Sequence, residues 1–332
     1  MSVETTVKTV CAGQSAADKP QEIIVRIDNL VKRYKEKPAV DHFSLEVRQG
    51  EILGLVGPNG SGKTTTINCL LSLLKYDRGE IEIFGKPMHP AARDIKSRIG
   101  VVMQNVAVID ELSVYDNIDF FCGLYIRDRA LRKKYVEEAL DFTNLQEYRK
   151  YRPGKLSGGL LRRLNIACGI AHKPKLIIFD EPTVAVDPQS RNAILSGIRR
   201  LNEEGATVIY TSHYMEEVEE LCSRIVIIDN GHEVADGTVS ELKGSLRNRE
   251  TITVEAKNIS EEELSGLKKI SHVYDVTFHE GEIEIRCDGG SHNLVHIINY
   301  LMEKNIDFGR VNTKLPTLND VFLEITGKEL RD

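Results

Sequence analysis

The sequence predicts an α/β protein with a mostly parallel sheet, followed by a smaller α+β domain. Over residues 23–246, short apolar or β-branched runs alternate with amphipathic helical patterns, an order typical of a parallel sheet covered by helices. Several of the runs are continuously apolar, as expected for strands that are buried on both faces. The composition then changes near residue 247, because the last 86 residues carry 16 acidic and 11 basic side chains.

We expect three regions along the chain. Residues 1–22 are polar and lack an apolar period, which predicts a loose N-terminal tail. Residues 23–246 form the main domain, with strands expected at 23–25, 43–47, 52–56, 99–103, 176–179, 207–211 and 225–228. Helices are expected in this domain near 63–74, 114–124, 130–142, 158–171, 188–204 and 213–222.

Residues 247–332 have a different pattern and form a small accessory or regulatory domain. Strands are expected at 252–256, 273–278, 283–286 and 308–311, with helices at 261–267 and 294–304. The resulting β-α-β-β-α-β order is that of a ferredoxin-like unit. A final short helix is expected at 318–326.

Composition excludes several classes of protein. The chain has 332 residues, of which 41% are hydrophobic and 28% charged, as in ordinary globular proteins. No apolar run approaches the roughly 18 residues of a spanning helix, and the first 22 residues lack the apolar segment of a secretory signal. The formal net charge of −6 argues against a broad nucleic-acid-binding face, so we expect no nucleic-acid partner. The six cysteines have no metal-binding spacing and are interpreted as reduced thiols.

The strongest local signal is a phosphate loop. Residues 57–64 have the pattern G-x-x-x-x-G-K-[ST], follow an expected strand and open an expected helix. Glycines let backbone N–H groups approach phosphates, and the helix N-terminus adds its positive dipole end. Lys63 is expected to reach the β- and γ-phosphates, and the Thr64 hydroxyl to bind Mg²⁺. The nucleotide-binding residues assigned here are Gly57, Pro58, Asn59, Gly60, Ser61, Gly62, Lys63, Thr64 and Thr65.

Two carboxylates follow the apolar strand expected at 176–179. The carboxyl ends of parallel strands are where ligands bind in open α/β sheets, so Asp180 and Glu181 are expected beside the phosphate loop. Asp180 would hold Mg²⁺, and Glu181 could polarise the attacking water.

A second anion-binding signal precedes another helix. Ser157, Gly158 and Gly159 stand at the start of the helix expected at 158–171, where a serine and two glycines favour phosphate. Two phosphate sites in one chain suggest a nucleotide that is bound between two subunits.

With these motifs, residues 23–246 resemble the ATP-binding subunit of an ATP-binding cassette (ABC) transporter, because the segment Leu156–Leu160 is similar to that family's signature. The resemblance implies a P-loop NTPase fold of the ABC nucleotide-binding type with a helical subdomain, and the cofactors ATP and Mg²⁺. Leu160 and Ala185 depart from the family's commonest pattern, without removing a phosphate ligand or a catalytic carboxylate.

The resemblance also implies roles for isolated residues. Tyr34 matches the adenine-stacking aromatic, and Gln104 matches the glutamine that senses Mg²⁺ and contacts the membrane partner. Asp187 lies in the loop that crosses the dimer interface, and His213 matches the switch histidine at the γ-phosphate. The implied catalytic set is Glu181, His213, Lys63 and Gln104, and the implied Mg²⁺ set is Thr64, Gln104 and Asp180. The signature residues Ser157, Gly158 and Gly159, together with Asp187, complete the nucleotide contacts.

The C-terminal segments 318–323 and 326–328 resemble those of daunorubicin-resistance-type ATP-binding subunits. The resemblance implies an exporter with a separate polytopic membrane subunit, which would hold this chain at the cytoplasmic face of the membrane. Because the chain has one phosphate loop and one signature, we expect it to pair with a second ATP-binding subunit and to sandwich ATP head to tail. A homodimer would suffice for this arrangement. Two alternatives are a soluble ABC ATPase that acts on ribosomes or DNA, and an unrelated P-loop kinase or GTPase.

Overall fold

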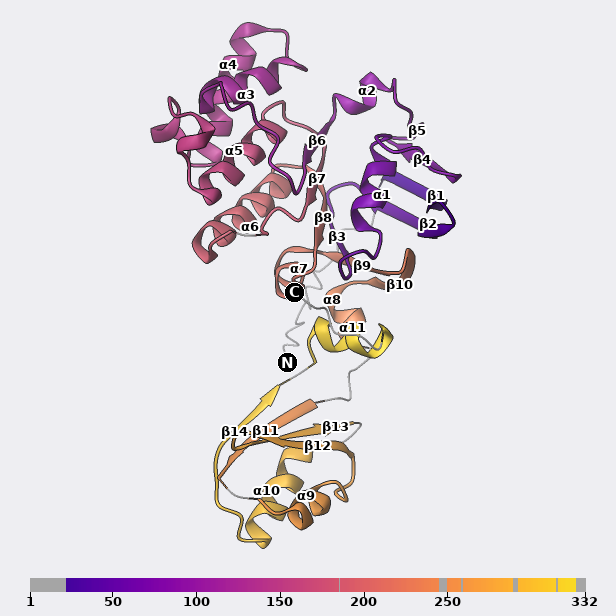
Figure 1. The fold of residues 1–332 in the computed structure, drawn as a ribbon, viewed down its shortest axis with the longest axis vertical. Helices are drawn as coiled ribbons and strands as arrows, with labels where there is room; N and C mark the ends of the chain where they lie inside the picture. The colour runs from indigo at the N-terminus through magenta and orange to yellow at the C-terminus, as the bar shows by residue number, and fades with distance from the viewer. Residues whose placement is uncertain are drawn as a thin grey trace, which may run out of the picture.

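The computed structural model describes residues 22–184, 186–244, 250–257, 259–288, 292–314 and 316–326 (Figure 1). Apart from Glu22, the expected N-terminal tail lies outside these residues, and so does the expected boundary at 246–247. The division of the chain at these boundaries therefore stays a prediction. Within the described residues, we find no helix with the length and apolar character that crossing a membrane requires.

A six-stranded sheet with the order β10-β9-β3-β8-β7-β6 forms the centre of the larger part of the molecule. Its strands are β3 (Ile52–Val56), β6 (Ile99–Val102), β7 (Leu176–Asp180), β8 (Thr207–Ser212), β9 (Arg224–Asp229) and β10 (His232–Gly237). All neighbours pair in parallel except β10, which is antiparallel to β9. Every residue of β3 and β7 is buried, which explains their apolar sequences. The carboxyl ends of the parallel strands consequently share one edge of the sheet.

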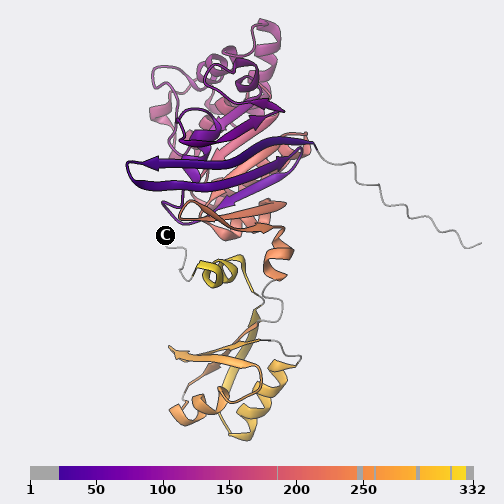
Figure 2. The same cartoon turned by 90° about the vertical axis from the view of Figure 1, so that its right-hand side faces the viewer.

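An antiparallel sheet lies beside the parallel one and has the order β2-β1-β4-β5 (Figure 2). It contains β1 (Ile23–Tyr34), β2 (Lys37–Arg48), β4 (Arg78–Ile83) and β5 (Lys86–Pro87). The sequence predicts only short strands at 23–25 and 43–47. The observed hairpin of β1 and β2 is longer, and its repeated register shifts interrupt the apolar alternation by which a strand is recognised. One apolar core joins both sheets to α1 (Lys63–Leu70).

Three helices form a separate lobe beside the edge strand β6 (Figure 1). They are α3 (Val114–Gly123), α4 (Arg129–Phe142) and α5 (Gly158–Ile170). Each begins at a side-chain cap, formed by Ser113, Asp128 and Ser157 respectively. Their apolar faces meet in a core of their own, which matches the expected helical subdomain. The short connecting turns are α2 (Arg93–Lys96), η1 (Gln146–Tyr148) and η2 (Pro153–Lys155).

Two further helices follow β7 and β8 and pack with these strands in a second core. The first is α6 (Pro188–Glu203), which is capped by Asp187, and the second is α7 (Met215–Leu221). The short α8 (Val239–Gly244) follows β10. Because α6 and α7 each follow the carboxyl end of a parallel strand, the segments that enter them lie near the site described below.

The C-terminal part contains a four-stranded antiparallel sheet with the order β12-β13-β11-β14. Its elements are β11 (Glu250–Ala256), α9 (Glu261–Leu267), β12 (Val273–His279), β13 (Glu282–Cys287), α10 (Asn293–Glu303) and β14 (Phe308–Lys314). This order and pairing confirm the ferredoxin-like fold class. Figures 1 and 2 show α9 and α10 on the side of the sheet that faces away from the parallel sheet.

The last helix, α11 (Leu318–Thr326), packs against α7 and α8. Its buried side chains Leu318, Val321 and Phe322 belong to the same apolar core as α6, α7 and β8. The Leu318 backbone N–H also donates to Glu219 of α7 at 2.7 Å. The segment that follows the ferredoxin-like unit thus returns to the larger part of the molecule.

Candidate active site

The phosphate loop connects β3 to α1, as the sequence predicts. Gly57 lies so close to the Ile228 carbonyl that a Cβ at this position would be 2.1 Å from its oxygen. Gly60 and Gly62 have φ angles of 81° and 113°, which favour glycine over any residue with a side chain. The loop therefore needs its glycines to keep this conformation. The Ser61 hydroxyl is buried without a protein partner in the described residues, so a bound phosphate would satisfy a polar atom that is already out of water.

Lys63 folds back over this loop. Its Nζ donates to the carbonyl oxygens of Gly57 at 2.7 Å and Pro58 at 3.2 Å, and lies 3.5 Å from Glu181 Oε1. Burial lowers the pKa of the Lys63 ammonium below its usual value, and the charge of Glu181 opposes this shift. The Lys63 ammonium thus lies between the loop and the acidic end of β7.

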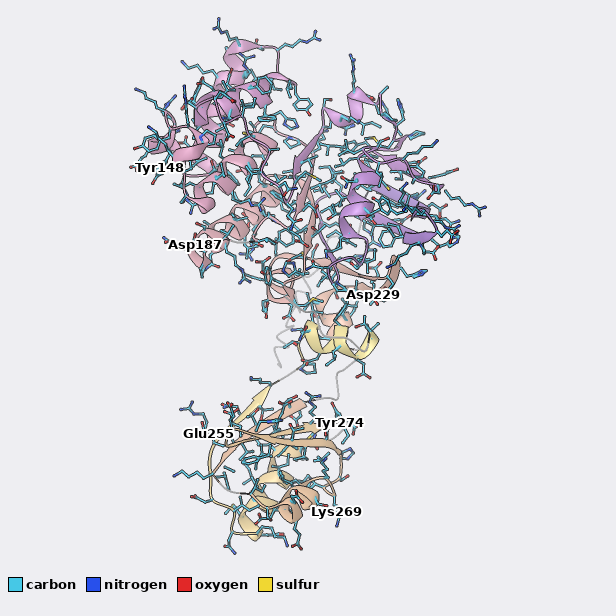
Figure 3. The ribbon with its side chains drawn as sticks, in the orientation of Figure 1. Tyr148, Asp187, Asp229, Glu255, Lys269 and Tyr274 are labelled. Atoms are coloured by element: carbon cyan, nitrogen blue, oxygen red, sulfur yellow. The ribbon has the colours of Figure 1, made fainter. Side chains whose placement is uncertain are left out.

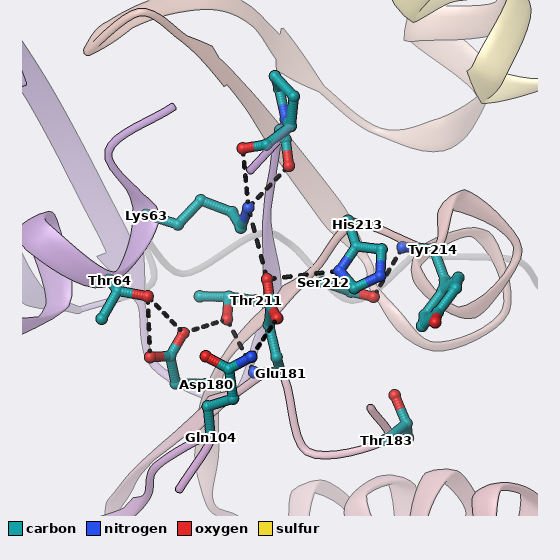
Figure 4. Close-up of polar contacts among 12 residues, drawn as sticks. Lys63, Thr64, Gln104, Asp180, Glu181, Thr183, Thr211, Ser212, His213 and Tyr214 are labelled. Carbon is teal, nitrogen blue, oxygen red and sulfur yellow. Dashed lines mark hydrogen bonds and ion pairs between the residues drawn. The ribbon is translucent and has the colours of Figure 1, made fainter. Parts of the chain in front are cut away.

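Asp180 ends β7 beside the first turn of α1. It accepts hydrogen bonds from the hydroxyls of Thr64 at 3.1 Å and Thr211 at 2.6 Å. These contacts bring together β7, β8 and the phosphate loop, which lie far apart in the sequence (Figure 4). Thr211 has no assigned role in the sequence prediction, although it is paired with Asp180 in the parallel register.

The oxygen donors at this position suit Mg²⁺. Thr64 has a hydroxyl, Asp180 a carboxylate and Gln104 an amide oxygen, all of them hard oxygen ligands. In the part of the chain that the structure describes, no group of three or more His, Cys, Asp or Glu side chains could hold a metal ion. Mg²⁺ in nucleotide sites commonly takes its other ligands from phosphate and water oxygens.

Glu181 is the centre of the cluster in Figure 4. Its carboxylate accepts a hydrogen bond from Gln104 Nε2 at 3.1 Å and lies 3.4 Å from His213 Nδ1. Its backbone has a φ angle of 48°, a left-handed conformation that costs roughly 1–2 kcal/mol in a residue with a Cβ. The Glu181 N–H donates to the carbonyl and hydroxyl oxygens of Thr211, which helps to maintain this conformation. Strain of this kind is concentrated at functional sites.

The signature residues Ser157, Gly158 and Gly159 do not belong to the cluster around Glu181. Ser157 caps α5 by accepting from the Leu160 N–H at 3.3 Å. A Cβ on Gly159 would be 2.5 Å from Ser190 Oγ and 3.1 Å from Asp187 Oδ2, so the starts of α5 and α6 are in contact. Figure 3 shows Asp187 at the edge of the molecule, at the start of α6. Among the described residues, no hydrogen bond or ion pair joins residues 157–159 to the phosphate loop.

Tyr34 and His213 complete the set of residues to which the sequence assigns a role in the site. Tyr34 ends β1 with 52% of its surface exposed, and Lys32 Nζ lies 5.4 Å from the centre of its ring. Its adenine-stacking role stays a prediction. The imidazole of His213 contacts the Tyr214 ring, with centroids 4.1 Å apart.

A buried polar cluster, which contains the neighbour of His213 in the chain, Ser212, has no counterpart among the predicted site residues. Glu217 on α7 is fully buried and contacts side chains from three other segments. The apolar side chains Met215, Val218 and Leu221 mark the buried face of this short helix. Glu217 borders that face, and an acidic residue there is the signal that could have revealed the cluster.

Family models match two stretches of the chain. The model described as "ABC transporter" matches residues 40–184, and the model of the C-terminal domain of DrrA1-3-like ATP-binding proteins matches residues 237–326. The first stretch contains the phosphate loop, the signature and the two carboxylates at the end of β7.

Similar curated proteins align with almost the whole chain. The linearmycin resistance ATP-binding protein LnrL of Bacillus subtilis (strain 168) is 39% identical over 93% of this chain and 100% of its own length. The daunorubicin resistance ATP-binding protein DrrA2 of Streptomyces coeruleorubidus is 32% identical over 91% of this chain and 95% of its own. The Nod factor export ATP-binding protein I of Paraburkholderia xenovorans (strain LB400) is 32% identical, with shares of 94% and 99%.

Solved structures of similar fold are ATP-binding cassettes. One is the dimeric cassette MJ0796 in a post-hydrolysis state bound to ADP and Pi, with a TM-score of 0.60 and 27% identity over 65% of this chain and 98% of that chain. Another is cbiO1 from Clostridium perfringens, with a TM-score of 0.62 and 25% identity over 68% of this chain and 92% of that chain.

Proposed function

We propose that this chain, which belongs to the ATP-binding subunits of ABC transporters, works as one half of a head-to-tail homodimer that powers export. The chain is an ATPase, and subunits of this family work with membrane subunits. The observation that carries the proposal is the division of the site into two groups. Lys63, Glu181 and His213 form one group, and Ser157 and Asp187 belong to the other.

The two groups of residues have different roles. In the first, the loop N–H groups and Lys63 bind the phosphates, and Tyr34 stacks on the adenine. Glu181 accepts a hydrogen bond from the attacking water and draws off its proton, and His213 contacts the γ-phosphate beside it. Thr64, Asp180 and Gln104 would hold Mg²⁺, which neutralises charge on the phosphate oxygens when it is bound.

The second group acts on the nucleotide of the partner. Ser157, Gly158 and Gly159 lie at the N-terminus of α5, where backbone N–H groups are available to an anion. Asp187 lies beside them in the interface loop. With two chains arranged head to tail, each ATP is held by the phosphate loop of one chain and the signature of the other. The dimer closes on ATP and opens after hydrolysis, when the γ-phosphate no longer joins the two chains.

The dimer must transmit this motion to a partner in the membrane, so we place the chain at the cytoplasmic face. The segment 104–124 leads from Gln104 to an exposed apolar surface on and after α3. There Phe120 is 47% exposed and Leu124 60% exposed. We assign this surface to a short cytoplasmic helix of a polytopic subunit. The names of the relatives refer to linearmycin, daunorubicin and Nod factor, so we expect the membrane subunit to select the cargo.

Replacing both Phe120 and Leu124 with Asp is expected to abolish co-purification of the polytopic subunit from solubilised membranes, because two carboxylates would have to be buried in an apolar contact. ATP hydrolysis by the isolated cassette should remain. Leu73→Asp is the matched control, since Leu73 is 66% exposed and lies outside the lobe of α3, α4 and α5. Unchanged co-purification of the double variant, measured by mass spectrometry, would refute this docking surface.

A further inference from the structure

Glu217 on α7 holds a buried network of polar side chains. Its Oε2 accepts hydrogen bonds from the hydroxyls of Tyr210 at 2.6 Å, Thr183 at 2.8 Å and Ser212 at 3.1 Å. Its Oε1 lies 2.7 Å from Arg191 Nε. The Glu217 side chain is 0% exposed, whereas that of Arg191 is 35% exposed. One carboxylate thus gathers four partners at a place that water does not reach.

Such a group is costly to bury and is weak evidence for a contribution to stability. A buried carboxylate must recover its lost hydration through hydrogen bonds and an opposite charge, and apolar residues of similar volume often stabilise a core equally well. Burial and the nearby Glu217 carboxylate raise the pKa of Tyr210 well above its usual value. The phenol therefore remains protonated and continues to donate to Glu217. The network has a defined set of donors around one acceptor, which suits a role in positioning.

The partners of Glu217 lie next to the residues that carry the proposed chemistry. Thr183 is two residues after Glu181, in the loop that leads to Asp187. Ser212 immediately precedes His213, and its hydroxyl also accepts from the Tyr214 N–H at 2.9 Å. The contacts of Glu217 therefore reach both segments that frame the Glu181–His213 pair.

Arg191 extends the same network toward the signature. It lies in the first turn of α6, after the cap formed by Asp187. Asp187 and Ser190 contact the position of Gly159 at the start of α5. A shift of Glu217 would consequently move the loop between β7 and α6 relative to His213.

We propose that Glu217 is a positioning residue for ATP hydrolysis, which fixes the loop after Glu181 and the residue before His213 in one arrangement. This inference rests on the catalytic roles proposed above for Glu181 and His213. Within the part of the chain that the structure describes, Glu217 contacts Thr183, Tyr210, Ser212 and Arg191 and makes no hydrogen bond or ion pair with the phosphate loop. Its loss should therefore disturb the attack on the γ-phosphate more than the binding of ATP.

The test is Glu217→Gln in the full chain, with steady-state ATPase kinetics. The amide keeps the volume of the side chain but replaces one acceptor oxygen with a donor and removes the counter-charge of Arg191. We expect kcat to fall by about 10- to 100-fold, because small misplacements of reacting groups can lower the rate this much. KM for MgATP should stay within about twofold. Glu216→Gln is the matched control, because Glu216 is exposed on the same helix. This control should leave kcat, KM and Tm unchanged.

An unchanged kcat, or a rise in KM at constant kcat, would overturn the proposal. Should the Glu217 variant not fold, Tyr210→Phe removes a single donor and keeps the buried ring. Its kcat should fall by about threefold or more at constant KM, consistent with one lost charge-assisted hydrogen bond, and an unchanged kcat would again overturn the proposal. His213→Ala and Glu181→Gln are measured in parallel. If both hydrolyse ATP normally, the catalytic roles proposed for Glu181 and His213 fail. A loss of hydrolysis in these two variants but not in Glu217→Gln refutes only the positioning role.

Discussion

Glu181→Gln is expected to lower kcat for ATP hydrolysis by about 10²- to 10⁴-fold, the usual contribution of a positioned general base. The amide retains the shape of the side chain and still fits beside Gln104 and His213, which lie 3.1 and 3.4 Å from the carboxylate oxygens. ATP affinity should remain, because the phosphate contacts come from the loop and Lys63. Hydrolysis and equilibrium nucleotide binding, measured on the same preparation, check both statements.

Glu203→Gln is the control for this substitution, since it makes the same chemical change at an exposed position on α6. It should leave both quantities unchanged. A Glu181→Gln protein that hydrolyses ATP at the normal rate would exclude Glu181 as the base. A protein that loses ATP binding and hydrolysis together would instead point to a role for Glu181 in holding Lys63.

Lys63→Met is expected to weaken ATP binding by about 100-fold or more, because each hydrogen bond to a charged group contributes about 1.5–3 kcal/mol. The Lys63 side chain is only 4% exposed and its ammonium lies over the loop carbonyls, so the charge is already largely desolvated before phosphate is bound. Methionine keeps the aliphatic stem and removes the charge. Calorimetric titration with ATP measures the loss.

Lys133→Met is the corresponding control, since Lys133 is exposed on α4, in the lobe of α3, α4 and α5. Its ATP affinity should equal that of the unaltered chain. Retention of normal ATP affinity by Lys63→Met would place the phosphates somewhere other than the loop of residues 57–64.

The catalytic cluster was predictable from the sequence because its residues lie at or just after the carboxyl ends of strands with a clear apolar pattern. Asp180 ends a strand of the parallel sheet, and the phosphate loop, Gln104 and His213 each lie just after one. Parallel strands put their carboxyl ends on one edge, so the spacing in the sequence sufficed to predict that these residues meet. The ferredoxin-like unit was predictable for a similar reason, since its strands and helices have distinct periods.

Contacts that depend on tertiary packing could not be predicted from these patterns. The left-handed φ of Glu181 is supported by hydrogen bonds to Thr211, which the pairing of β7 and β8 brings within reach. The Glu217 network joins side chains from β8, α6 and a loop, and no local period marks it. The docking of α11 on α7 depends on apolar side chains that would equally suit the neighbouring ferredoxin-like unit.

The central claim is that each ATP is shared between two chains, and mixing two inactive variants tests it most directly. Lys63→Met disables the phosphate loop. Ser157→Asp puts a negative charge at the signature while retaining a residue that caps helices well, and Ser157→Asn controls for the cap without the charge. A hybrid dimer then has one site in which the loop and the signature are both intact.

We predict that each variant alone is inactive and that an equimolar mixture regains ATP hydrolysis. The recovered rate should be about a quarter of that of the unaltered protein, if half of the dimers are hybrids with one of two symmetric sites intact. A mixture that hydrolyses ATP no faster than the sum of its two components would contradict a site shared between chains.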